Sequence, residues 1–298
     1  MISIIITAWE EPNSLRECIR RLLIQDIPYK FDIWITCPDK KTKQVVMDYK
    51  KKYPKIINFL HQPREWRKNI MINILTKMAK GDIQIFLDGD IFISENSIKE
   101  IYEKFKDPKI GCVTGRPVPQ NPRGDIFGYW SNLLCDAGAH EARLKRAKKD
   151  YFLECSGYLW AFRNHVIKKF PIDIAEDTAI PLLFRKRNYK IAYAQNAKVY
   201  VKFPTTLKDF IEQKKRTAKA HQSLEKYVNV RKLPRTKTFK NEIFEGHRAF
   251  FYPRNIKEII WTLLLFPLRL YIWILVFYHT KIKKQHYQDA WKRIESTK

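Results

Sequence analysis

The chain has 298 residues, of which 45% are hydrophobic, and its 57 Lys and Arg against 31 Asp and Glu give a formal net charge of +26. This length can bury a sizeable core, and the hydrophobic content excludes a chain that is disordered throughout. The basic excess requires an anionic partner, which can be nucleic acid, an anionic membrane surface or phosphorylated substrates. Five cysteines, an odd number without paired metal-ligand spacing, indicate reduced thiols in a cytosolic compartment.

Short apolar runs alternate with amphipathic stretches in the first part of the chain. The pattern predicts strands at 2–6, 31–37, 56–60 and 83–87, and helices that start at Asn13 or Ser14 and that cover 42–53 and 64–78. Strands that alternate with helices of about 10–15 residues are typical of βαβ units and a parallel sheet. The first strand lacks the basic and small-residue features of a signal peptide, so none is expected.

The stretch 83–90, Ile-Gln-Ile-Phe-Leu-Asp-Gly-Asp, combines a buried strand with two carboxylates. Asp88 and Asp90 follow the apolar run, where open α/β sheets place their ligands. Gly89 permits a bend and the close approach of a bulky anion. Two carboxylates this close repel each other, and a hard divalent cation that itself holds a diphosphate would relieve the repulsion. A solvated Asp-Gly-Asp turn is the alternative interpretation.

The pattern is looser after Asp90. Helices are predicted at 97–105, 127–149, 176–188 and from Thr205 or Thr206 to 227, and strands at 110–114, within 153–163 and within 190–203. The stretch 115–123 contains three prolines and is predicted to be an ordered loop, and the basic stretch 228–255 is predicted to be a mobile loop.

The last long feature is an apolar stretch at 259–278 that contains Thr262, Pro267 and Arg269. Twenty residues in a helix are about long enough to span a bilayer. Arg269 near mid-depth would cost about 2.5–3.5 kcal/mol, and basic residues flank both ends of the stretch. We therefore expect a bent re-entrant or interfacial hairpin with both ends in the cytoplasm, and keep a membrane span and a buried core helix as alternatives.

The order of these motifs resembles glycosyltransferase family 2, whose members use nucleotide-diphosphate sugars. The resemblance covers about residues 2–220 and rests on the strand and acidic loop at 2–11, Arg-Lys-Asn at 67–69, the Asp-x-Asp motif, Glu176-Asp177 and residues 213–217. The last of these, Gln-Lys-Lys-Arg-Thr, is similar to the Gln-x-x-Arg-Trp motif of chitin, cellulose and hyaluronan synthases.

The resemblance implies an α/β protein with the GT-A fold, which is Rossmann-like, with a mostly parallel central sheet flanked by helices, and with C-terminal membrane-associated helices. The catalytic domain would cover 1–225, with a nucleotide-sugar half at 1–115 and an acceptor half at 116–225. A basic loop at 226–255 and a membrane-associated apolar hairpin or helix with a basic tail at 256–298 would follow.

Roles for individual residues follow from the same resemblance. Asp177 matches the catalytic base, and Glu176 beside it would hold its position or raise its pKa. Asp90 and Asp88 match the site for Mn²⁺ or Mg²⁺. The expected nucleotide-sugar contacts are Thr7, Glu10, Asp39, Arg67, Asp88, Gln213 and Arg216, and the expected acceptor contacts are Gly157, Tyr158 and Trp160.

Several of these assignments have ordinary structural alternatives. Gln213 and Arg216 also fit the solvated face of a basic helix, and Glu176-Asp177 also fits a helix N-terminus that favours carboxylates. Packing alone would explain the aromatic residues, and surface charge would explain Arg67 and its neighbour Lys68. His221 and His247 are the preferred candidates for a further metal ligand because both lie in the region expected to be mobile over the site, and a surface or core histidine is the alternative.

Two departures from the family pattern narrow the expected activity. Thr217 replaces the motif tryptophan, and Cys-Pro-Asp-Lys at 37–40 replaces the acidic motif that often follows the second strand. Because polymer synthases also carry several membrane helices, we expect inverting, metal-dependent transfer of one sugar. The acceptor would be a hydroxyl or phosphate of a lipid-linked molecule at the cytoplasmic face of the membrane, where the basic excess meets anionic lipid.

Three alternatives remain at this point. A basic nucleic-acid-binding protein lacks support from any zinc, helix-turn-helix or RNA-recognition motif. A sugar-phosphate nucleotidyltransferase would need a glycine-rich loop after the first strand, and residues 7–13 contain no glycine. A catalytically inactive scaffold would not require the acidic motifs.

Overall fold

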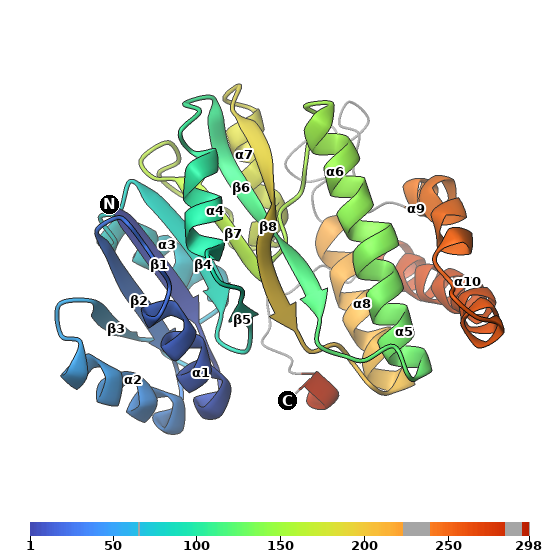
Figure 1. The fold of residues 1–298 in the computed structure, drawn as a ribbon, viewed down its shortest axis with the longest axis horizontal. Coiled ribbons are helices and arrows are strands. Elements are labelled where there is room, and N and C mark those ends of the chain that lie inside the picture. The colour runs from blue at the N-terminus through green and yellow to red at the C-terminus, as the bar shows by residue number, and fades with distance from the viewer. Residues whose placement is uncertain (65, 223–238, 284–293, 298) are drawn as a thin grey trace.

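The central element is a mixed β-sheet, seen in the computed structural model, which describes residues 1–298 except 65, 223–238, 284–293 and 298 (Figure 1). Within the described residues the sheet has eight strands in the order β3-β2-β1-β4-β7-β6-β8-β5. The strands are β1 (Ile2–Thr7), β2 (Phe31–Cys37), β3 (Ile57–His61), β4 (Ile83–Asp88), β5 (Phe92–Ile93), β6 (Ile110–Pro119), β7 (Leu159–Arg163) and β8 (Lys190–Val201).

The N-terminal half of the sheet is parallel, as the sequence predicts. β1 pairs in parallel with both β2 and β4, and β2 pairs in parallel with β3. All six residues of β1 are buried because helices cover both faces of the sheet. Its side chains alternate: Ile4 packs with Leu15 and Ile19 on one face, whereas Ile5 packs with Ile72 and Leu75 on the other.

The helices on these two faces follow the predicted alternation. α1 (Pro12–Leu23), α2 (Lys40–Lys52) and α4 (Ser97–Lys104) contribute to the first face, and α3 (Lys68–Met78) and α7 (Glu176–Arg185) contribute to the second. α1 begins at Pro12 instead of Asn13 or Ser14, because proline has no N–H to lose in the first turn of a helix.

β6 is longer than predicted and includes Pro117 and Pro119. β6 pairs with β7 only through residues 112–114, and beyond that point it pairs with β8, after a register shift. Proline is tolerated where a strand has no neighbour to receive its N–H. The expected loop at 115–123 is therefore wrong for residues 115–119.

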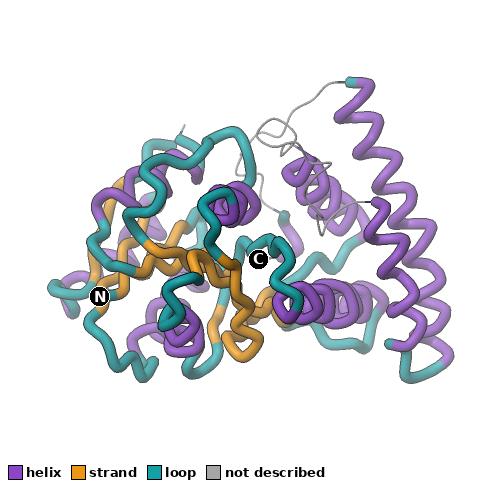
Figure 2. The backbone as a smooth tube through the Cα atoms, turned by 90° about the horizontal axis from the view of Figure 1, so that it is seen from above, coloured by secondary structure: helices purple, strands orange, loops and turns teal. Residues whose placement is uncertain are grey.

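The remaining helices form a layer beyond β8 (Figures 1 and 2). They are α5 (Ile126–Leu133), the π-helix η1 (Leu134–His140), α6 (Glu141–Lys148), α8 (Leu207–Gln222), α9 (Phe239–Glu245), the 3₁₀-helix η4 (Gly246–Phe251), α10 (Ile256–Phe277) and η5 (Tyr278–Ile282), with a short η6 (Glu295–Thr297) near the C-terminus. Residues 239–251 are thus helical where a loop was predicted, and 228–238 lie outside the described residues.

α10 is one continuous helix, so the predicted hairpin is wrong. With η5 it forms a helix of 27 residues, and within the described part of the chain it alone is long and apolar enough to cross a membrane. The helix continues through Pro267, and Asn255 caps its start by accepting a hydrogen bond from the Glu258 N–H.

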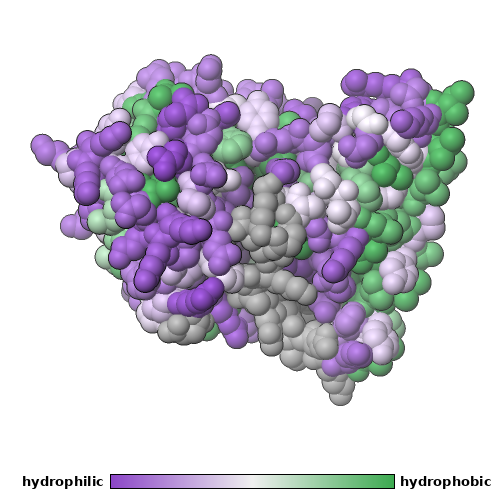
Figure 3. All heavy atoms as spheres, turned by 90° about the horizontal axis from the view of Figure 1, so that it is seen from below, coloured by the Kyte–Doolittle hydropathy of each residue, from purple (hydrophilic) through white to green (hydrophobic). Residues whose placement is uncertain are grey.

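α10 buries polar side chains against the domain and exposes apolar side chains on its outer side. We call this arrangement the inverted polarity of α10. Its inner side buries Glu258 and Thr262 together with Leu265, Ile272 and Val276, and its outer side is apolar. Twelve large hydrophobic side chains between 256 and 282 are exposed, and they gather along the same edge of the molecule in Figure 3: Ile256, Ile259, Ile260, Leu263, Leu264, Phe266, Leu270, Tyr271, Ile274, Phe277, Tyr278 and Ile282. Burial of polar groups and exposure of apolar ones is the reverse of an ordinary surface helix.

Candidate active site

A pocket of about 940 Å³ begins at the carboxyl edge of the parallel strands and continues to α10. The strand register sets Thr7 of β1 directly beside Asp88 of β4, and both residues line the pocket. Asp90 lines it from just beyond the strand. A Cβ atom on Gly89 would lie 2.5 Å from the Ala8 Cβ. Because the segments that follow β1 and β4 pass this close to each other, only glycine fits between Asp88 and Asp90.

A lysine joins the carboxylates of two distant motifs. Lys68, in the first turn of α3, places its ammonium 2.7 Å from Asp88 and 2.8 Å from Glu176, the first residue of α7. Burial alone would lower the pKa of Lys68, but the two carboxylates outweigh it and raise that pKa well above its usual value. Lys68 is therefore charged and holds the acidic residues of β4 and α7 at one site.

Asp177 lies at the start of α7 and also lines the pocket. Its backbone carbonyl accepts a hydrogen bond from the Cys155 N–H, at 2.9 Å, which ties α7 to the segment before β7. A Cβ atom at Gly157 would lie 3.5 Å from Asp177 Oδ2, so this glycine approaches the carboxylate closely. Asp177 can therefore act on a group that enters the pocket beside Gly157.

The aromatic residues near β7 divide between the pocket and the core. Tyr158 lines the pocket and its ring packs edge-on against Phe203. Trp160 is only 1% exposed and stacks on Phe86, with ring centroids 4.3 Å apart. The expectation that Trp160 contacts an acceptor is therefore wrong: strand alternation directs its side chain into the core.

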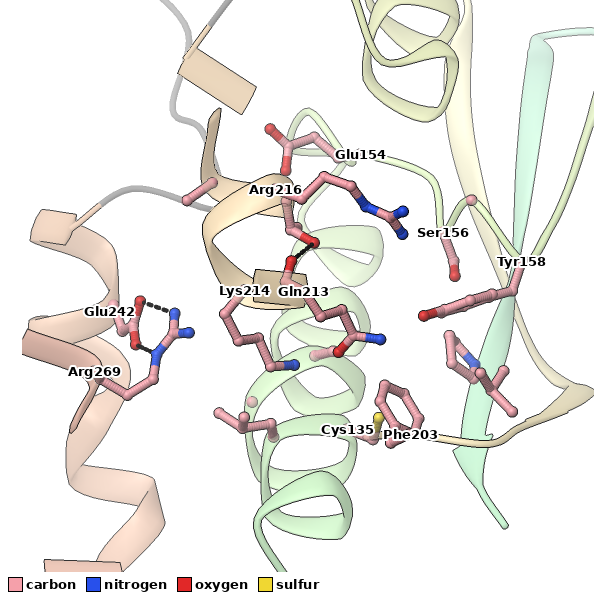
Figure 4. A pocket seen from close by; sticks show the side chains of 18 of the residues that line it. Cys135, Glu154, Ser156, Tyr158, Phe203, Gln213, Lys214, Arg216, Glu242 and Arg269 are labelled. Carbon is pink, nitrogen blue, oxygen red and sulfur yellow. Dashed lines mark hydrogen bonds and ion pairs between the residues drawn. The ribbon is translucent and has the colours of Figure 1, made fainter. Parts of the chain in front are cut away.

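α8 supplies the basic wall of the pocket (Figure 4). Gln213 and Arg216 both project into it from one side of the helix, opposite Ser156 and Tyr158. Gln213 is 7% exposed, and its Oε1 has no hydrogen-bond partner among the described residues. Thr217 donates a hydrogen bond to the Gln213 carbonyl at 3.0 Å, so its hydroxyl is bonded within α8. It does not offer the aromatic ring for stacking that a tryptophan at this position would provide.

Three residues expected to contact the nucleotide do not line the pocket. Glu10 is exposed and has a positive φ of 55°, and the neighbouring Glu11 lines the pocket instead. Asp39 caps α2 by accepting from the Thr42 N–H, and its second oxygen accepts from the Glu10 N–H. Arg67 is the exposed residue before α3, and Lys68 takes the inward position.

Among the pocket residues near the nucleotide end, Trp9 and Glu11 were not assigned from the sequence, and Lys68 was considered only beside Arg67. Trp9 and Glu11 share their loop with Glu10, and Lys68 is adjacent to Arg67. The sequence therefore located both motifs correctly, but the residue chosen in each lies one position away from a residue that lines the pocket. The left-handed backbone at Glu10 and the exact start of α3 decide which side chain turns inward.

The two candidate histidines do not complete a metal site in the described structure. His247 is exposed and its Nδ1 lies 2.8 Å from the Phe244 carbonyl, while the side chain of His221 lies outside the described residues. No group of three or more His, Cys, Asp or Glu within the described residues is arranged to hold a metal. Asp88 and Asp90 nevertheless suit a hard cation such as Mg²⁺, which takes one or two carboxylates and completes its shell with substrate phosphates and water.

All five cysteines are buried and free, in accordance with the expectation of reduced thiols. Burial raises the pKa of the Cys135 thiol, which lines the pocket, to about 11. This thiol is therefore neutral at physiological pH and is no nucleophile.

Together the fold and this carboxylate-lined edge define an α/β protein of the GT-A-like class. The structure is similar to that of a mannosyltransferase from Pyrobaculum calidifontis solved in complex with GDP-Man and Mn²⁺, with a TM-score of 0.62 and 15% identity, over 95% of this chain and 80% of that one. Residues 1–220 match the model of the glycosyltransferase-like family 2, and the chain belongs to this family.

Relatives in sequence are distant and longer. An N-acetylglucosaminyltransferase of Rhizobium meliloti (strain 1021) is 21% identical over 229 residues and covers 71% of this chain and 53% of that protein. A poly(ribitol-phosphate) beta-glucosyltransferase of Bacillus spizizenii is 28% identical over 127 residues, 41% of this chain and 20% of that protein. The chain spans about half the length of the first of these relatives.

Proposed function

We propose that the protein transfers one sugar from a nucleotide-diphosphate sugar to a membrane-presented, lipid-linked acceptor, with inversion at C1. The observation that carries the proposal is the convergence of Asp88, Asp90 and Asp177 on one pocket, although Asp177 is distant from the other two in sequence. Family membership supports this reading over a nucleic-acid-binding protein or a nucleotidyltransferase.

The donor would bind at the end of β1 and β4. Thr7, Trp9 and Glu11 line this part and would surround the nucleotide, and Lys68 and Arg216 would contact the diphosphate. Asp88 and Asp90 would hold a divalent cation there, which when bound neutralises charge on the leaving diphosphate. The complex of the Pyrobaculum mannosyltransferase with GDP-Man and Mn²⁺ supports such a donor and such a cation.

Asp177 would serve as the general base. An acceptor hydroxyl would lose its proton to the Asp177 carboxylate as its oxygen forms the bond to C1, while the bond from C1 to the diphosphate breaks on the opposite face. General-base catalysis contributes a factor of about 10²–10⁴ in rate. Gly157 and Tyr158, which border Asp177 and the pocket, would receive the acceptor.

The inverted polarity of α10 supports docking on a lipid surface. Its inner side is held along most of its length: Glu258 pairs with Arg123 at 2.6 Å, Thr262 hydrogen-bonds Tyr129 at 2.6 Å, and Val276 is fully buried. A helix covered on one side by a polar domain cannot cross a bilayer, whereas it can lie in the interface with its apolar side in the acyl region.

Charge around α10 supports an anionic lipid surface on the cytoplasmic side. Arg254 and Lys257 lie at the start of the exposed apolar stretch, and Lys281 and Lys283 lie at its end. Each basic residue near an anionic leaflet contributes about 1 kcal/mol. The pocket is also lined by Leu265, Phe266 and Leu270 of α10, so a lipid-linked acceptor would reach it along this helix.

A panel of UDP- and GDP-sugars with Mn²⁺ tests the proposed function. A ligand present at 100 times its dissociation constant stabilises a protein by about 2.7 kcal/mol, which thermal unfolding detects easily. We expect at least one nucleotide sugar to stabilise the protein and to be hydrolysed only with Mn²⁺ or Mg²⁺, and Asp90→Ala to abolish both effects. Asp26→Ala, which removes an exposed carboxylate elsewhere, is the control. Absence of any nucleotide-sugar binding would contradict the proposal.

A further inference from the structure

The pocket contains a buried cation that the proposed sugar transfer does not use. Arg143, on α6, is 7% exposed and lines the pocket at the end away from Asp88. Its Nε and Nη1 atoms are buried and have no hydrogen-bond partner among the described residues. A buried guanidinium loses its hydration, so leaving its donors unmatched is costly, and such a group is suited to an anionic ligand.

The other charges at this end are compensated. Arg248 of η4, which lines the pocket, pairs with Glu245 at 2.7 Å, and Lys145 of α6 reaches the same Glu245 at 3.4 Å. The buried Glu154 raises the pKa of Arg146, against the larger effect of desolvation, which lowers it. Glu245 is therefore balanced by two basic residues other than Arg143.

Two further basic residues, Arg116 and Lys214, have contacts of their own. Arg116 of β6 pairs with Asp136 of η1 at 3.1 Å, and Asp136 also accepts a hydrogen bond from the Tyr252 hydroxyl at 2.8 Å. Lys214 of α8 lines the pocket and lies 5.3 Å from the centre of the Phe210 ring. Arg143 and Lys214 both lower the pKa of Cys135, against the dominant effect of burial, and all three residues line the pocket.

The helix that carries this region leaves room for a ligand. η1 is a π-helix, a form that is rare in proteins overall but occurs frequently at functional sites. Small residues of η1 and α6 line the pocket next to Arg143: Ala137, Gly138, Ala139 and Ala142. Larger side chains at these positions would fill the space that a ligand needs in order to reach the guanidinium.

We propose that Arg143, with Arg248 and Lys214 lining the same pocket, forms a subsite for a phosphoryl group of the acceptor. The planar guanidinium offers two parallel N–H donors to phosphate oxygens, which a lysine cannot reproduce. This inference rests on the proposed function for its link to sugar transfer, and it names the acceptor class as phosphorylated. The phosphoryl group belongs either to a lipid phosphate or to a soluble phosphorylated compound.

Binding of farnesyl phosphate and farnesol to the full chain in detergent micelles tests the subsite. We expect the wild type to bind farnesyl phosphate at least tenfold more tightly than farnesol, and Arg143→Gln to remove most of that preference, because the charge-assisted hydrogen bonds to the phosphate are then lost. Lys148→Gln removes an exposed charge from the same helix and should leave the preference unchanged. Equal binding of the two probes by the wild type would overturn the subsite, as would an undiminished preference in Arg143→Gln.

Two further arms keep the result interpretable. Arg143→Lys retains the positive charge but lacks the two parallel N–H donors of the guanidinium. An intermediate preference of this variant for farnesyl phosphate over farnesol supports the subsite even if Arg143→Gln fails to fold. Competition by inorganic phosphate at a concentration similar to that of farnesyl phosphate identifies a soluble source, and much weaker competition identifies a lipid source. Mn²⁺-dependent hydrolysis of the donor by the wild type is measured separately, and a wild type that hydrolyses no nucleotide sugar would refute the sugar transfer alone.

Discussion

Lys68 and Glu176 lie 2.8 Å apart, although more than a hundred residues separate them in the chain. The same ammonium lies 2.7 Å from Asp88, so one lysine links the end of β4 to the start of α7. The side chains of Lys68 and Glu176 are 16% and 10% exposed, and water therefore screens their charges only weakly. This contact holds the two acidic motifs together in the structure.

Replacing Lys68 by alanine should destabilise the protein. Two carboxylates would then face each other without a cation, and we expect a loss of about 2–3 kcal/mol, below the ~3–5 kcal/mol for a fully buried pair because Asp88 is partly exposed. Mn²⁺ should raise the melting temperature of Lys68→Ala more than that of the wild type, since it replaces the missing charge. Lys77→Ala, at an exposed site of the same helix, is the control. Equal stabilities of Lys68→Ala and Lys77→Ala would refute the linking role.

The contact between Glu242 and Arg269 should make stability depend on acid pH. Arg269 Nη2 and Trp273 Nε1 each donate to Glu242 Oε2 at 2.7 Å, which fixes α9 on α10. Burial opposes ionisation of Glu242, but the contacts with Arg269 prevail and place its pKa below the usual 4.5. The stabilisation is therefore complete above the usual pKa and is lost as the pH falls through the lowered one.

Urea unfolding of Glu242→Gln between pH 3 and pH 8 measures this effect. We expect a destabilisation of about 1–2 kcal/mol near neutral pH that shrinks in acid as the wild-type carboxylate becomes protonated. Glu95→Gln, at an exposed site, should show no such pH-dependent difference. A destabilisation that stays constant down to pH 3 would argue against the ionic contact.

The outer side of α10 should govern membrane binding without governing folding. Leu263 and Leu270 are 53% and 50% exposed, so replacing both by glutamate removes little packing. We expect vesicle binding to fall by more than tenfold, because burying each leucine in the acyl region contributes about 1.5–3 kcal/mol. The melting temperature should change little. Co-sedimentation with anionic vesicles measures binding, and Ile24→Glu, 66% exposed at the end of α1, is the control.

Much of the parallel half of the fold could be predicted from the sequence because its signals are local. β2 matches its predicted range, 31–37, and the strand before Asp88 was correctly placed. The order of the acidic motifs also led to the family. The direction of individual side chains was harder to predict from the sequence. The positive φ of Glu10 directs Glu11 into the pocket, and the start of α3 places Lys68, not Arg67, on the pocket side.

Tertiary contacts explain the other differences. Trp160 joined the core because β7 inserts between β4 and β6, a pairing that no local pattern reveals. The inverted polarity of α10 did have a signal in the sequence: Glu258, Thr262 and Arg269 recur at helical spacing on one side of an otherwise apolar stretch. That spacing predicts a polar inner side and favours one continuous helix over a hairpin.

The turnover number of Asp177→Asn is the most direct test of the account. Asparagine keeps the shape of the side chain but cannot accept the proton of the acceptor hydroxyl. We predict that kcat for sugar transfer falls by about 10²–10⁴-fold while the affinity for the nucleotide sugar stays within about twofold of the wild type. Turnover equal to that of the wild type would contradict the assignment of Asp177 as the base, and with it the proposed reaction at this pocket.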